Sequence, residues 1–142
     1  KILLDSVLLF ENGFEFKEPE NEYETICFFS ALVGAQLTPF ETFKLHDYTA
    51  KDGIDAISSY KISSDDVIKT HVATEFEFKL SNFSAHGHPI NHTQIIICWI
   101  VDNIRETIKD SPYDWLKFMV TEFDDIPVVE IRFFPKVREA RG

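Results

Sequence analysis

The sequence has few cysteines and no long apolar run. Its two cysteines, Cys27 and Cys98, lie in separate apolar stretches without metal-ligand or redox spacing, which excludes a disulfide framework and predicts buried free thiols. No apolar run approaches the ~20 residues that a membrane-spanning helix requires, and no signal peptide is recognisable. We therefore expect an intracellular, cytoplasmic protein without a membrane partner.

Positive charge is also scarce. The chain carries 14 Lys and Arg against 24 Asp and Glu, which gives a formal net charge of −10. A domain that binds nucleic acid unaided usually has a basic surface, because neutralising phosphates supplies most of the non-specific affinity. The deficit leaves three interpretations: the acids gather around a metal ion, another domain supplies the affinity for nucleic acid, or nucleic acid is not the ligand.

Several common chemical motifs are missing as well. The sequence has no glycine-rich phosphate loop, no Ser/His/Asp or Cys/His ordering typical of nucleophilic hydrolases, and no internal repeat. What it does have is apolar material: 44% of the residues are hydrophobic, and 14 of them are phenylalanines. A length of 142 residues suits one packed domain, residues 1–142, and we expect this domain to be cut from a longer protein.

Hydrophobic periodicity predicts an α/β fold with one mixed central sheet flanked by helices. Residues 1–10 fit a short helix or a buried strand equally well, and the basic tail, residues 136–141, is expected to be a solvated end or linker. The remaining elements are predicted as helices over 20–33, 104–109 and 113–120, and as strands over 40–46, 54–61, 73–80, 95–101 and 128–134.

The strand predicted at 73–80 carries the strongest chemical signal. Its strict alternation places Glu75, Glu77 and Lys79 on one face. Asp55 lies upstream on a neighbouring predicted strand. Carboxylates of this kind hold Mg²⁺ or Mn²⁺, while a lysine steadies a scissile phosphate or the attacking water. The alternative is that the three charges form only the solvated face of an edge strand.

A polar loop follows this strand and has three interpretations. It can contribute metal ligands, contact a phosphate or order the loop, or simply expose histidines; its polarity also admits a small-molecule sensor as a third class of function. Trp99, in the apolar run beyond the loop, is expected in the core. The loop residues considered as accessory site residues are Asn82, His86 and His88.

The order of these features resembles the restriction-endonuclease-like PD-(D/E)XK nuclease superfamily over residues 20–102. The shared pattern is a helix with acids, a meander holding one Asp, a Glu-x-Lys strand and a further strand after a crossover. The proline of the superfamily's name is absent, since Gly53 and Ile54 precede Asp55. A narrower similarity, to microbial proteins of this superfamily, rests on Glu75-Phe76-Glu77-Phe78-Lys79, Ser81-Asn82-Phe83, His86-Gly87-His88 and Ile97-Cys98-Trp99.

The resemblance implies a restriction-endonuclease-like mixed sheet and a Mg²⁺- or Mn²⁺-dependent endonuclease that hydrolyses DNA. It also implies nucleic acid as the partner, with affinity supplied largely by other domains, and a homodimer as one assembly. The implied site consists of Asp55 and Glu77 as metal ligands, Lys79 as the catalytic lysine, Glu75 as an assisting acid, and Glu24 on the first helix as an accessory acid, with Glu22 as its rival.

One departure from the narrower group favours a second interpretation. Those relatives carry an Asp just before the last strand, where this chain has Thr93 and Gln94. If that acid belongs to their site, the domain here is a catalytically inactive nuclease-like fold that serves as a binding or dimerisation module. The acidic net charge points the same way.

Overall fold

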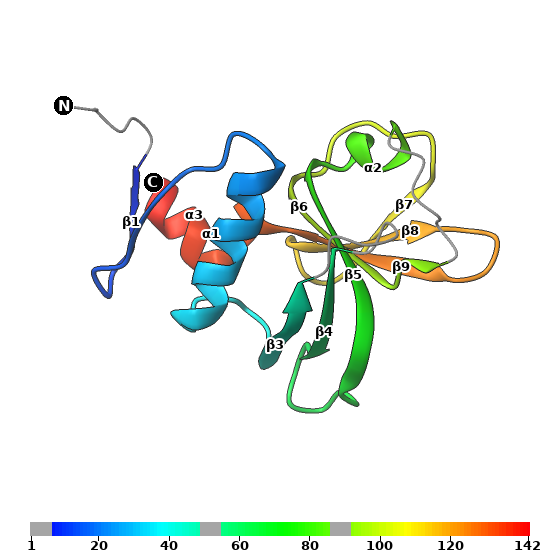
Figure 1. The fold of residues 1–142 in the computed structure, drawn as a ribbon, viewed down its shortest axis with the longest axis horizontal. Helices are drawn as coiled ribbons and strands as arrows, with labels where there is room; N and C mark the ends of the chain where they lie inside the picture. Colours follow the sequence, from blue (N-terminus) through cyan, green and yellow to red (C-terminus); the bar gives the residue numbers. More distant parts are fainter. Residues whose placement is uncertain (1–6, 49–54, 86–91) are drawn as a thin grey trace.

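The computed structural model describes residues 7–48, 55–85 and 92–142, and Figure 1 shows their arrangement. Strands β1 (Val7–Leu9) and β2 (Glu15–Lys17) pair antiparallel in a small sheet. The part of the expectation for residues 1–10 that concerns 1–6 lies outside the described residues, and residues 7–9 form a strand. Among the described residues, no helix has the length and apolar character needed to cross a membrane.

The main sheet has seven strands in the order β3-β4-β5-β6-β9-β8-β7. Neighbours β3, β4 and β5 form an antiparallel meander, β5, β6 and β9 run parallel, and β9, β8 and β7 are again antiparallel. The predicted class, an α/β fold built on a mixed sheet, is confirmed. The strand bounds are β3 (Thr42–Tyr48), β4 (Ala56–Lys61), β5 (Lys69–Lys79), β6 (Ile95–Ile100), β7 (Ile108–Asp110), β8 (Leu116–Val120) and β9 (Asp125–Glu130).

Helix α1 (Glu22–Gly34) is the helix predicted over 20–33. Its N-cap is Asn21, whose side chain accepts a hydrogen bond from the backbone N–H of Glu24 at 2.9 Å. The cap explains why the helix begins after Pro19 rather than at it. Figure 1 shows α1, α3 and the β1–β2 hairpin on one side of the main sheet and the short helix α2 (Ser81–Ala85) on the other.

The helices predicted at 104–109 and 113–120 are wrong, because the chain forms β7 and β8 there. Pro112 does not open a helix. Instead the Ser111 hydroxyl accepts from the N–H of Tyr113 at 3.0 Å and donates to the Leu116 carbonyl at 2.6 Å, which makes a turn. Leu116 then pairs with Val129 of β9. β8 is a mostly apolar segment of only five residues, which fits the helical and the strand period equally well. It is a strand because β9 is available to pair with it.

The C-terminal residues also differ from the expectation. Strand β9 ends at Glu130, and the chain continues through a 3₁₀ turn, η2 (Ile131–Phe133), into helix α3 (Pro135–Arg141). Val137 and Phe134 are fully buried. The segment expected to be a solvated tail is therefore a helix packed on the core, with its proline at the first turn, where no backbone donor is needed.

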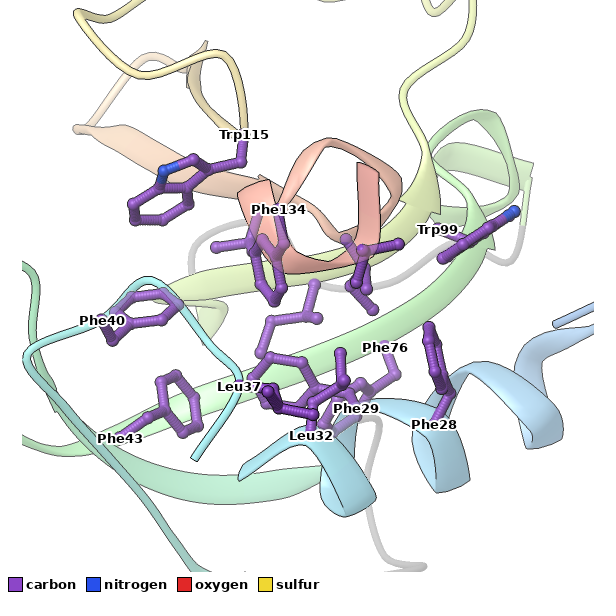
Figure 2. Close-up of a cluster of buried hydrophobic side chains, with 14 of the residues drawn as sticks. Phe28, Phe29, Leu32, Leu37, Phe40, Phe43, Phe76, Trp99, Trp115 and Phe134 are labelled. Carbon is purple, nitrogen blue, oxygen red and sulfur yellow. The ribbon is translucent and has the colours of Figure 1, made fainter. Parts of the chain in front are cut away.

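An aromatic core lies between the sheet and the layer of α1 and α3 (Figure 2). Phe29 is at its centre, with ring centroids 4.9 Å from Phe43, 5.8 Å from Phe76 and 6.3 Å from Phe134. Trp99 is buried in the same core, as predicted. Of the two cysteines, Cys98 is buried as expected, but Cys27 is exposed. A second, smaller cluster covers the opposite face, and it includes Leu80, Phe83, Ile96, Cys98 and Met119.

Replacing Phe29 by Ala should lower the free energy of unfolding by about 3–5 kcal/mol, because it removes a buried ring from the centre of four packed elements. Chemical denaturation followed by tryptophan fluorescence measures this loss. Phe123, 72% exposed, is the matched control, and Phe123→Ala should change the free energy by less than about 0.5 kcal/mol. Equal losses for the two variants would contradict a core centred on Phe29.

Candidate carboxylate site

Strand β5 lies inside the main sheet, between β4 and β6. Phe76 packs against Phe29 of α1, so alternation directs Glu75 and Glu77 to the opposite face, where they pair with Ile96 and Cys98 of β6. Both glutamates are 0% exposed. The alternative interpretation as the solvated face of an edge strand is therefore wrong for these two residues. Lys79 ends the strand and is exposed.

Asp55 is brought to β5 by backbone pairing. It lies just before β4, one residue outside the strand rather than within the predicted strand 54–61, and residue 54 itself is outside the described part. Its N–H donates to the Thr74 carbonyl at 3.2 Å. Its carboxylate Oδ2 accepts from the N–H of Phe76 at 2.8 Å, the residue between the two buried glutamates. The structure thus joins Asp55 to the strand of Glu75 and Glu77, as the sequence predicted.

Of the two acids considered on α1, the structure brings Glu22 rather than Glu24 close to the buried glutamates. Glu24 is held at the helix start: its Oε1 lies 2.8 Å from Lys17 Nζ and accepts from the N–H of Glu20 at 3.1 Å. The hydrogen bond with Lys17 lowers the pKa of Glu24. Glu22, considered in the sequence as the rival, instead interacts electrostatically with both buried glutamates. Glu24 does not reach the buried pair in this structure, because it forms an ion pair with Lys17 of β2.

Four carboxyl groups therefore influence one another. Burial, followed by the charge and hydrogen bonding of Asp55, raises the pKa of Glu75 to about 9. Burial also raises the pKa of Glu77, with further contributions from a hydrogen bond and the charge of Glu22 and from the charge of Asp55. Because each negative charge opposes the ionisation of the next in a site of low polarity, the set favours bound protons or a cation.

A fifth acid, Glu130, lies on the same face and was not singled out in the sequence. Cys98 pairs with Glu77 on one side and with Glu130 on the other. Burial, with the charges of Glu130, Asp102 and Glu77, raises the pKa of the Cys98 thiol. Glu130 is neutralised locally, since it accepts from Arg132 Nε and forms an ion pair with Lys117. The sequence offered one indication of Glu130: it is an acid at the end of an apolar strand, two residues before Arg132.

Of the polar loop, the structure describes residues 81–85 and 92–94. His86 and His88 lie outside the described residues, and Asn82 is half-buried in α2. Ser81 donates its N–H and hydroxyl to the Asp102 carboxylate at 2.9 and 2.6 Å. Gln94 extends the pairing of β5, because its Oε1 accepts from the Ala73 N–H at 2.8 Å and its own N–H donates to the Ala73 carbonyl at 2.9 Å. Its side chain thus serves the backbone.

The donor set is all oxygen, which suits a hard divalent cation such as Mg²⁺. Within residues 7–48, 55–85 and 92–142, however, no three Asp, Glu, His or Cys side chains stand together in positions ready to hold an ion. The carboxyl groups interact, but they are not close enough together to ligate one ion. Repulsion between them favours this separation. The donor chemistry fits the cation, and a shift of side chains would have to accompany its binding.

Comparison of the chain with protein-family models, curated proteins and solved structures found no match.

Stability should fall as the pH rises from about 5 to 9. Over this range the folded protein keeps the proton of Glu75, whose pKa is about 9, while the unfolded chain has lost it. One such group lowers the free energy of unfolding by at most about 1.4 kcal/mol per pH unit. Glu75→Gln, a neutral replacement of equal size, should flatten this slope in urea titrations at several pH values, whereas Glu122→Gln, at an exposed turn, should not. A slope unchanged by Glu75→Gln would show that this carboxyl group ionises normally.

Proposed function

We propose that the chain is a restriction-endonuclease-like, PD-(D/E)XK nuclease domain that hydrolyses DNA phosphodiester bonds with Mg²⁺ or Mn²⁺. The observation that carries the proposal is the burial of Glu75 and Glu77 on an interior strand, close enough to Asp55 and Glu22 for their charges to interact. Burying two carboxyl groups beside other acids is costly to a fold. A role that needs them, such as holding a divalent cation, accounts for their presence.

The order of elements supports the same proposal. Helix α1 precedes the antiparallel meander β3-β4-β5, and β6 then joins β5 in parallel after a crossover. Asp55 stands at the start of the middle strand of the meander, and the Glu-x-Lys segment ends the third. This is the arrangement that the sequence resemblance implies for the superfamily.

The proposed roles follow from burial and exposure. Asp55 and Glu77 would hold the ion, and Glu75, buried on the same strand and close to Asp55, would assist. When bound, Mg²⁺ supplies Lewis-acid polarisation of the phosphate and a water of lowered pKa. Lys79 is exposed at the end of the same strand, so its ammonium group can meet a substrate phosphate and offset the negative charge that develops in the transition state.

A second candidate is a nuclease-like fold without turnover, acting as a binding or dimerisation module. Two observations favour it. Among the described side chains, no group of ligands stands ready to hold a metal. In addition, the Gln94 side chain accepts a backbone hydrogen bond, in the region where the microbial proteins of the narrower similarity carry an acid. Under this proposal the buried carboxyl groups remain protonated, and their raised pKa values let the fold tolerate them.

Glu77→Gln and Lys79→Ala should each lower Mg²⁺-dependent cleavage of DNA by about 10²–10³-fold, because the first removes a ligand of the ion and the second removes a cation that offsets the transition-state charge. Supercoiled plasmid and labelled single- and double-stranded oligonucleotides, incubated with Mg²⁺, Mn²⁺ or EDTA, provide the assay. Glu122→Gln and Lys44→Ala should cut like the wild type, because both residues are exposed and neither β3 nor the β8–β9 turn borders β5. Wild-type protein that cuts no nucleic acid, or site variants that cut equally well, would refute the nuclease proposal.

Mg²⁺ or Mn²⁺ should raise the melting temperature of the wild-type protein. An ion at 100 times its dissociation constant adds about 2.7 kcal/mol to the free energy of unfolding. The shift should grow between pH 6 and pH 9 as protons leave Glu75 and Glu77, and Asp55→Asn should abolish it. A wild-type protein indifferent to both ions over this pH range would favour the inactive module.

A further inference from the structure

Positive charge is scarce on this chain, yet three cationic side chains surround one aromatic ring. Lys117 of β8, Arg132 of η2 and Arg138 of α3 lie 5.7, 4.8 and 5.0 Å from the centroid of the Phe133 ring. We call these four residues the Phe133 cation cluster. The three cationic side chains are 21%, 29% and 52% exposed, respectively, so each remains accessible from solvent.

The cluster has a surplus of positive charge. Two acids pair with it: Glu130, which accepts from Arg132 Nε at 2.8 Å and lies 3.7 Å from Lys117 Nζ, and Asp114, which accepts from Arg138 Nη1 at 2.8 Å. Three cations against these two acids leave one positive charge. The pairing of Arg132 through Nε leaves its two terminal nitrogens for another anion.

These contacts also hold the side chains in place. Glu130 is almost fully buried and accepts a further hydrogen bond from the Val101 N–H at 2.7 Å, so the carboxylate that orients Arg132 is itself fixed. The Phe133 ring supports both guanidinium groups by cation–π contact. A planar guanidinium group that is already oriented loses less entropy when it binds a phosphate in a bidentate manner.

The cluster lies at the same sheet edge as Lys79. Strands β5, β6 and β9 run parallel, so Lys79 and Arg132 both come from their C-terminal ends. Lys79 pairs with Ile100 near the end of β6, and Arg132 lies in η2, directly after β9 ends at Glu130, the partner of Cys98. Two strand spacings, about 10 Å, separate β5 from β9 across the sheet. β8 begins at this edge as well, since the Trp115 carbonyl accepts from the Glu130 N–H.

We propose that the Phe133 cation cluster binds the phosphodiester backbone of the nucleic acid and leads it to Lys79 and the buried carboxyl groups. The inference rests on the proposed nuclease function and adds a binding surface that lies apart from the cutting site. A nucleic-acid backbone fits better than an acidic protein, because the cluster and Lys79 lie at the same C-terminal end of the parallel strands, and Lys79 belongs to the candidate phosphodiesterase site. Because its surplus of positive charge is small, the Phe133 cation cluster should bind the nucleic-acid strand with modest affinity at physiological salt and serve to position it.

Binding without cleavage tests the inference separately from the proposed function. Fluorescence anisotropy of labelled single-stranded and duplex oligonucleotides, in EDTA and at several low salt concentrations, should show weak, salt-dependent binding. Arg138→Gln and Lys117→Gln should weaken it equally for oligonucleotides of unrelated sequence. Each lost phosphate contact should lower the slope of log K against log salt by about 0.9 for duplex and 0.7 for single strands. Arg138→Lys should fall between Arg138→Gln and wild type.

Arg105→Gln is the matched control, an exposed arginine on the connection between β6 and β7, and it should bind as wild type. Melting temperatures of all variants detect any unfolding. Arg132 is left intact because it pairs with buried Glu130 at 2.8 Å, more closely than Lys117 does at 3.7 Å. Cluster variants that bind as tightly as wild type overturn the inference while leaving the nuclease proposal standing. If the wild-type protein does not bind oligonucleotides but binds polyglutamate through the same residues, the inference is overturned in favour of an acidic protein partner. Wild-type protein that binds neither probe also overturns it.

Discussion

The structure depends on one unfavourable arrangement: two glutamates side by side along an interior strand, with no solvent exposure. The other face of the same strand offsets the cost, because Phe76 is fixed between α1 and the sheet by the ring of Phe29. Asp55 adds a hydrogen bond to the backbone between the glutamates, so the acids are tied to the strand's own register. A one-residue slip of β5 would exchange the phenylalanine and glutamate faces, which no core could accommodate.

The fold was predictable where periodicity is long and strict. The alternation on β5 and the capped apolar stripe of α1 appear in the sequence because both depend on neighbours along the chain. β7 and β8 were predicted as helices because their short apolar segments match either period, and β8 gains its strand state from pairing with β9. Helix α3 was missed for a related reason, since its helical state depends on burying Val137 among residues far along the chain.

The candidate site, too, has a part that could be predicted from the sequence and a part that could not. Asp55, Glu75, Glu77 and Lys79 come from consecutive strands of a meander, where sequence order nearly dictates proximity. The choice between Glu22 and Glu24 could not be made from the helix alone, because Lys17 of the separate β1–β2 hairpin decides it. Glu130 and the Phe133 cation cluster were missed because β9 reaches β6 only after the long excursion through β7 and β8.

That excursion has a consequence for biosynthesis. Of the strands that the structure describes, β9 comes last in the sequence, yet it lies between β6 and β8 in the sheet. While the chain is still emerging from the ribosome, the apolar run of β6 has a partner on one side only and presents an open strand edge on the other. The sheet can be completed only after residues 125–130 have been released, so folding depends on contacts between segments that are distant in the sequence. Until then, β6 is the part of the newly synthesised domain that is most exposed to aggregation or chaperone binding.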